Sequence, residues 1–112
     1  MIYTSYFAKM KKYPDMKFIS VARFTPKGIN IPEITELMPS EQLIYLWKNG
    51  KIDEKRYTEI YMEQLIGINR LKLGNMLQGK CIVCYERSGT FCHRHIIADW
   101  LRSVGFEVEE LE

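Results

Sequence analysis

Reactive side chains gather on both sides of one short turn in the last third of the chain. Cys84 and Glu86 precede this turn, and Cys92, His93 and Arg94 follow it. A deprotonated cysteine is a nucleophile, so Cys84 or Cys92 could attack a substrate with His93 as the base. Glu86 could act as a general base or accept a hydrogen bond from a ligand hydroxyl. These residue types predict an anion site with a thiol and an imidazole nearby.

An apolar strand and an amphipathic helix must position these side chains. Residues 80–86 read as a strand, whose period-two geometry puts the thiol of Cys84 and the carboxylate of Glu86 on one face. The helix predicted over 92–104 has an apolar stripe that includes His93 in its first turn. Its first backbone N–H groups have no intrahelical partner, and the arginine beside them favours a phosphate or carboxylate ligand.

The order of these residues also resembles a known family. Cys-x-Glu, a short polar loop and Cys-His-Arg opening a helix resemble the C-terminal signature of the domain-of-unknown-function 488 family, small bacterial and phage proteins. Residues 2–6 and 19–26 resemble the first and second strands of the family. Residues 37–61 resemble the helical middle of its shorter members. The resemblance covers nearly the whole chain, and it implies a fold and a site location but no reaction.

The second strand departs from the family pattern at one position. Many members carry an Asp two residues before the Arg of this strand, where the chain has Val21. If that Asp takes part in chemistry in other members, this chain binds a ligand without catalysing a reaction. The resemblance therefore leaves open whether the chain is an enzyme.

Length and composition indicate one globular domain spanning residues 1–112. A second core would leave each half of the 112 residues too small to bury enough apolar surface. The 46% hydrophobic and 27% charged residues are typical of globular domains. No apolar run is long enough to cross a bilayer, and the N-terminus does not resemble a signal peptide, so we expect a cytoplasmic protein with no membrane partner. Three cysteines in such a protein predict reduced thiols.

Positive charge is concentrated in the amino-terminal third of the chain. Residues 1–30 hold six basic residues against one acid, whereas the remaining residues hold ten against thirteen. The six are Lys9, Lys11, Lys12, Lys17, Arg23 and Lys27. Such a segment would attract an anionic ligand or a nucleic acid backbone, although a solvated loop is the simpler explanation of Lys9, Lys11 and Lys12.

The pattern along the chain predicts an α/β fold. We expect strands at residues 2–7, 17–23, 80–86 and 106–111. Helices are expected from the N-cap Ser40 to residue 50, from the N-cap Asp53 onward, over 70–77 with a break near Gly74 or Gly79, and over 92–104. Helical connections permit parallel strands, so the prediction is a single small layered domain with a mostly parallel, Rossmann-like four-stranded sheet and helices packed on it.

The carboxyl ends of parallel strands share one edge of a sheet, and this predicts one crevice. It should gather ligand-binding residues Thr4, Ser5, Arg23 and Arg94 with the candidate catalytic residues Cys84, Cys92, His93 and Glu86. Each has a plainer interpretation as a packed or solvated residue. Trp47, Tyr57, Tyr61 and Trp100 recur at helical spacing and are expected in the core or an interface.

Cysteine spacing raises the question of a metal, which the strand geometry argues against. Cys81 and Cys84 have a common metal-ligand spacing, but residues three apart in a strand point to opposite faces. We therefore predict no metal site, and the cofactor stays unassigned.

Two main functional hypotheses follow from the sequence, beside a third reading as an oligomer with no ligand, and the sequence leaves the oligomeric state unknown. The first is an α/β domain that binds a small anion such as a nucleotide or sugar phosphate at the turn between the third strand and the last helix, with or without cysteine and histidine chemistry. The second is a non-catalytic adaptor that binds nucleic acid or a host protein through the basic amino-terminal third.

Overall fold

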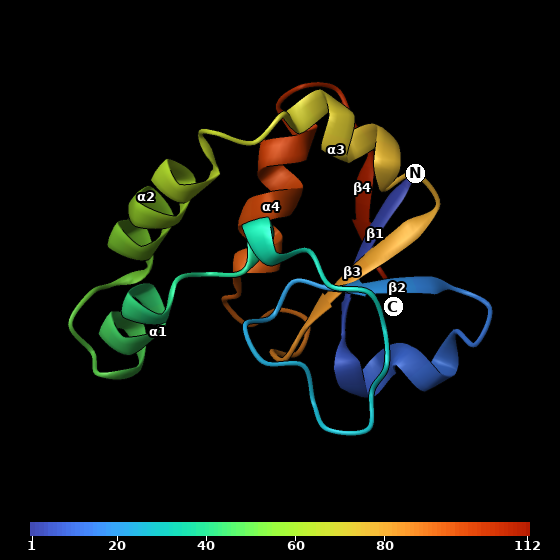
Figure 1. Cartoon of the computed structure of the whole chain (residues 1–112), viewed down its shortest axis with the longest axis horizontal. Coiled ribbons are helices and arrows are strands. Elements are labelled where there is room, and N and C mark those ends of the chain that lie inside the picture. The colour runs from blue at the N-terminus through green and yellow to red at the C-terminus, as the bar shows by residue number, and fades with distance from the viewer.

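Four parallel strands form the sheet in the computed structural model, which describes residues 1–112 (Figure 1). They are β1 (Ile2–Tyr6), β2 (Lys17–Ser20), β3 (Lys80–Cys84) and β4 (Val108–Glu110). Their order across the sheet is β2-β3-β1-β4, and every neighbouring pair is parallel. The predicted α/β class and parallel sheet are confirmed.

Four α-helices and two short 3₁₀ helices complete the chain. The α-helices are α1 (Glu41–Lys48), α2 (Glu54–Leu65), α3 (Arg70–Met76) and α4 (His93–Arg102), and the 3₁₀ helices are η1 (Phe7–Lys12) and η2 (Thr35–Leu37). The side chains of Ser40 and Asp53 accept hydrogen bonds from backbone N–H groups in the first turns of α1 and α2. Both predicted N-caps are therefore present, because these short acceptors satisfy donors that the helix itself cannot.

The strands are shorter than the sequence pattern predicts. β2 ends at Ser20 and β3 at Cys84, whereas the expected ends were residues 23 and 86. β3 lies between β2 and β1, and the last residue of β1, Tyr6, pairs with Cys84. Because neither neighbouring strand continues, residues 85 and 86 have no ladder to join, and their side chains are free to turn away from the sheet.

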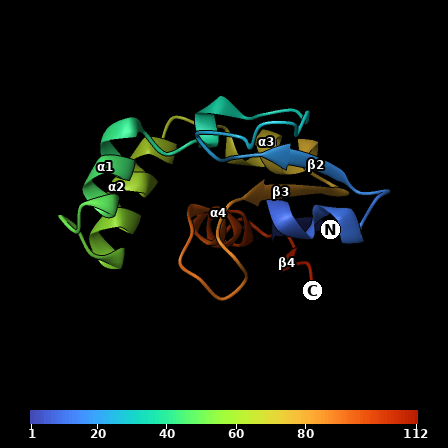
Figure 2. The same ribbon diagram turned by 90° about the horizontal axis from the view of Figure 1, so that it is seen from below.

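Helix α4 packs on the sheet, and the α1–α2 hairpin lies beside α4 on the side away from the sheet (Figure 1). Figure 2 shows that the arrowheads of β2 and β3 point toward this hairpin. A continuous cluster of 25 buried hydrophobic residues joins the strands with residues from all four α-helices. The hairpin thus faces the carboxyl edge of the sheet, where the sequence predicts the ligand.

None of the helices combines the length and the apolar character needed to cross a bilayer.

Candidate functional site

A pocket of about 340 Å³ lies between the carboxyl edge of the sheet and the α1–α2 hairpin. Cys84, Cys92 and His93 line it, together with Arg23 and Glu86. The sequence placed these five residues in one crevice, and they do come together around this pocket. The remaining three residues of the predicted crevice, Thr4, Ser5 and Arg94, do not line it.

The imidazole of His93 has a fixed tautomer. Its Nε2 donates a hydrogen bond of 2.7 Å to the backbone carbonyl of Val21. Because a carbonyl only accepts, Nε2 carries the proton and Nδ1 keeps a free lone pair. Nδ1 lies 3.7 Å from Sγ of Cys92. Burial is the main cause that lowers the pKa of His93 to about 4, so the ring is neutral at pH 7.

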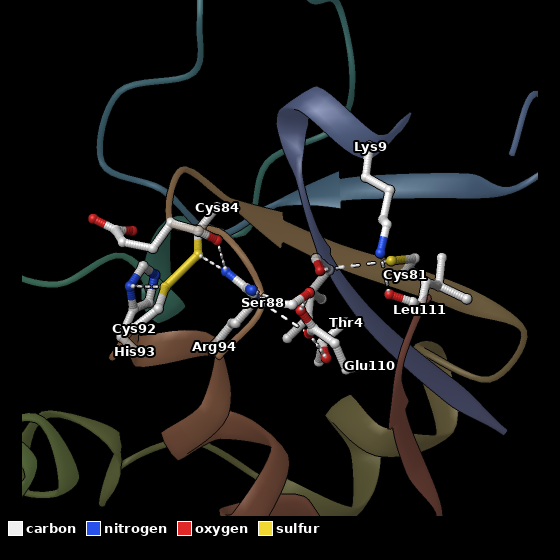
Figure 3. A network of polar contacts seen from close by, with 12 residues as sticks. Thr4, Lys9, Cys81, Cys84, Ser88, Cys92, His93, Arg94, Glu110 and Leu111 are labelled. Carbon is white, nitrogen blue, oxygen red and sulfur yellow. Dashed lines mark hydrogen bonds and ion pairs between the residues drawn. A yellow bond between two sulfur atoms is a disulfide. The ribbon is translucent and has the colours of Figure 1, made fainter. Parts of the chain in front are cut away.

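A disulfide joins Cys84 and Cys92 (Figure 3), although the cysteine count predicted reduced thiols. Cys84 ends β3 and Cys92 is the N-cap of α4, so the loop between them folds back and brings the two sulfurs together. Cys81 is free and buried, one of the residues packed in the core. Burial raises the pKa of its thiol to about 12, which leaves it protonated and unreactive.

Arg94 is completely buried and does not face the pocket. Its Nε and Nη2 donate to the carboxylate of Glu110 at 3.1 and 2.6 Å. Its Nη1 donates to Sγ of Cys84 at 2.9 Å and to the backbone carbonyl of Glu86 at 2.6 Å (Figure 3). All three guanidinium nitrogens are therefore engaged within the protein. The sequence predicts that Arg94 binds an anionic ligand at the start of the helix, but its guanidinium is paired with Glu110. Its side chain is buried in the core and does not lie on the exposed flank of the helix.

Glu110 is held by two hydroxyls as well as by Arg94. Thr4 and Ser88 each donate to its carboxylate. Burial alone would raise the pKa of Glu110, but the hydrogen bonds from Arg94, Ser88 and Thr4 lower it to about 2. Thr4 thus orients an internal carboxylate, where a ligand contact was predicted. Ser5 is also buried, and its hydroxyl has no hydrogen-bond partner. Thr4 and Ser5 are buried because β1 is a central strand, with β3 on one side and β4 on the other.

Arg23 provides the unpaired guanidinium of the pocket. It follows β2 in a loop, where its Nε donates to the carbonyl of Pro39 at 3.1 Å. No acceptor in the protein contacts its two terminal nitrogens, and it belongs to none of the three ion pairs of the chain. Lys48, from the end of α1, is a second unpaired cation in the pocket lining. The one carboxylate of the lining belongs to Glu86, which is exposed and makes no ion pair.

Aromatic side chains form much of the remaining wall, and the sequence did not predict this role. Trp47, Tyr57 and Phe91 pack against one another with ring centroids 4.9 to 5.6 Å apart. Phe24 and Tyr85 also line the pocket. The helical spacing of Trp47 and Tyr57 predicts a place in the core or an interface. Tyr57 is indeed buried in the core cluster and Trp47 packs against it, and both also line the pocket. The sequence signal for the aromatic wall is Phe91, which places an aromatic ring directly before Cys92 in the reactive turn.

The site can support several kinds of chemistry. The lone pair on Nδ1 of His93 lies near Sγ of Cys92 and can accept a hydrogen bond from its thiol when the disulfide is open. The unpaired Arg23 and Lys48 can hold an anion. Cys84, Cys92 and His93 each offer a donor atom within 4.8 Å of the other two, so they could also hold a metal ion.

Comparison with known proteins identifies one match. A family model described as "Active DUF488-N3 subclade" matches residues 2–105, a range that contains every residue lining the pocket. No curated protein and no solved structure matches the chain. The resemblance read from the motifs at the turn and in the strands is confirmed.

Proposed function

The chain belongs to the DUF488 family by its match over residues 2–105, and we propose that it binds a small anionic molecule in the pocket beside Cys84, Cys92 and His93. The observation that carries this proposal is the state of Arg23. Its Nε is anchored to Pro39, whereas its two terminal nitrogens have no acceptor in the protein. A guanidinium held in this way offers paired donors to an oxyanion at little cost in side-chain order.

The charges around Arg23 support an anionic ligand. Lys48, near the end of α1, adds a second unpaired cation to the pocket lining. Arg94, by contrast, is neutralised by Glu110 and contributes no free donor. A phosphate in this pocket would therefore meet two cations that form no ion pair, against the single carboxylate of Glu86.

The aromatic wall favours a nucleotide over a sugar phosphate. The pocket lining includes five aromatic residues: Phe24, Trp47, Tyr57, Tyr85 and Phe91. Bases stack on such rings with a gain of about 1–3 kcal/mol each, which a sugar does not obtain in the same way. Glu86 lines the same pocket, and its carboxylate would accept a hydrogen bond from a ribose hydroxyl. Cys84, Cys92, His93 and Glu86 stay candidates for a catalytic step on the bound ligand, and this role is a prediction.

A thermal-shift comparison of matched ligands tests the proposal. Each nucleoside monophosphate is compared with its uncharged nucleoside, and sugar phosphates with the parent sugars. A ligand present at 100 times its Kd stabilises the folded state by about 2.7 kcal/mol, which corresponds to a rise in Tm of about 10 °C for a domain of this size. We expect the phosphorylated members to raise Tm and Arg23→Ala to abolish the effect.

Arg56→Ala is the matched control for Arg23→Ala. Arg56 is an exposed arginine of α2 in an i,i+3 pair with Glu59, and it does not line the pocket. It removes the same charge from the chain, so it should leave the ligand effect unchanged. A ligand effect that survives Arg23→Ala would defeat the proposal.

The adaptor hypothesis predicts a different result in the same experiment. Oligonucleotides would bind with a steep salt dependence and would lose affinity in a Lys11→Ala, Lys12→Ala double variant. Both lysines are exposed on η1, whereas Lys9 is partly engaged because its Nζ donates to the carbonyl of Leu111. Oligonucleotide binding of this kind, with no response to nucleotides, would replace the pocket proposal by the adaptor.

A further inference from the structure

We propose that, when Cys84 and Cys92 are both reduced, they bind a zinc ion together with His93 and leave its fourth coordination position open to the pocket. This goes beyond anion binding, since the ion would bind whether or not a ligand is present. Zinc takes thiolate and imidazole ligands, and three protein ligands with one open position are typical of zinc sites that act on a bound molecule. Cys81 is not a ligand of this site, because the geometry of the strand argues against Cys81 and Cys84 binding the same ion.

The donor atoms of Cys92 and His93 have the spacing that zinc requires, and the two sulfurs, bonded to each other in this structure, separate on reduction. Zn–S and Zn–N bonds of about 2.3 and 2.0 Å at tetrahedral angles separate a sulfur and a nitrogen ligand by about 3.5 Å. Sγ of Cys92 and Nδ1 of His93 are 3.7 Å apart. The third donor, Sγ of Cys84, lies within 4.8 Å of both. The Cα atoms of the two cysteines are 7.7 Å apart, beyond the usual span of about 4.4–6.8 Å for a disulfide, so their backbone positions also accommodate an ion between the sulfurs.

The surroundings prepare each donor for a metal. The hydrogen bond from Nε2 of His93 to Val21 leaves the lone pair of Nδ1 directed at the sulfurs, and metal-binding histidines commonly make such an outer hydrogen bond. Nη1 of Arg94 donates to Sγ of Cys84 at 2.9 Å, which favours the thiolate form. Cys92 begins α4, where the positive end of the helix also favours a thiolate.

The open position follows from the place of the cluster in the wall of the pocket. Cys84, Cys92 and His93 all line it, while the other sides of the cluster are closed by Val21 and Arg94. No fourth Cys, His, Asp or Glu belongs to the cluster. A water molecule or an anionic group of a pocket ligand would therefore complete the coordination.

Metal analysis of the reduced full chain tests this proposal with no pocket ligand present. Failure of zinc binding can therefore be distinguished from failure of anion binding. A phosphine reductant opens the disulfide, which takes up two electrons from the phosphine and two protons from water, while the oxygen of that water forms the phosphine oxide. After incubation with zinc and removal of the excess, we expect one zinc per chain. Cobalt in place of zinc should give the strong visible absorption of a tetrahedral site and a thiolate charge-transfer band.

Variants assign the ligands. Cys92→Ser and His93→Gln should weaken zinc binding by about 100-fold or more, since loss of an outer partner alone costs about 10–100-fold. Cys81→Ala is the control, because it removes the third thiol and should leave both the stoichiometry and the cobalt spectrum unchanged. The proposal is wrong if the reduced wild-type chain retains no zinc, if cobalt lacks the thiolate band, or if Cys81→Ala loses the ion as Cys92→Ser does. The wild-type spectrum decides the matter even if a ligand variant does not fold.

Discussion

At the scale of single residues, the two arginines near the reactive turn have opposite roles. Arg94 opens α4 in a position that the sequence marks for anion binding, but its guanidinium is buried against Glu110. Arg23 stands in an irregular loop, yet its terminal nitrogens are free in the pocket. The difference depends on which acceptor each arginine meets in the fold. Sequence position alone cannot supply that information, because Glu110 lies 16 residues from Arg94.

The ion pair of Arg94 predicts how stability depends on pH. The pKa of Glu110 is about 2 in the folded chain, against an ordinary value near 4.5. The unfolded chain therefore binds the proton more tightly, so the contribution of Glu110 is complete above about pH 5 and is lost as the pH falls toward 2. Glu110→Gln should flatten this part of the acid-unfolding profile, measured as the free energy of unfolding in urea at several pH values.

The same variant should also lower stability at pH 7, because it leaves the buried Arg94 without its counterion. We expect a loss of about 2–3 kcal/mol, below the usual range for a fully buried pair because Glu110 is partly exposed. Glu109→Gln is the control, since Glu109 is exposed on the same strand and makes no ion pair. Equal acid profiles for the two variants would show that the pair contributes nothing.

At the scale of elements, the caps of α1 and α2 were predictable and the ends of the strands were not. Ser40 and Asp53 cap through contacts within a few residues, which a local pattern contains. The ends of β2 and β3 depend on where the neighbouring strands stop, and that is set by strand order. Helix α3 shows the same limit, because it runs through Gly74, where the sequence placed a possible break.

Gly74 permits a close approach of the Phe106 ring to α3. A Cβ at this position would lie 2.1 Å from Cε2 of Phe106, so Gly74→Ala must displace the ring. We expect a loss of about 1–3 kcal/mol in urea unfolding, as for other overpacked sites, despite the better helix propensity of Ala. Gly67→Ala is the matched control, because nothing lies within 4 Å of its Cβ position. A Gly74→Ala variant as stable as Gly67→Ala would contradict this packing.

At the scale of the whole molecule, the site is made by bringing two parts of the chain together. The sequence predicted the parallel sheet and the meeting of Arg23, Cys84, Glu86, Cys92 and His93, because these residues follow strands or begin the last helix. It did not predict that the α1–α2 hairpin closes the other side. Trp47 and Lys48 lie more than thirty residues from the reactive turn, and only the tertiary fold places them against it.

Mapping of ligand binding by NMR tests the central claim most directly. The ¹⁵N-labelled chain is titrated with each of the four ribonucleoside 5′-monophosphates, and amide shifts are followed residue by residue. We predict that at least one nucleotide shifts residues 22–24, 47–48 and 84–93 together, because these segments surround the pocket. Shifts confined to the lysines of η1, or no shift around the pocket with any of the four, would contradict the assignment of this pocket as a nucleotide site.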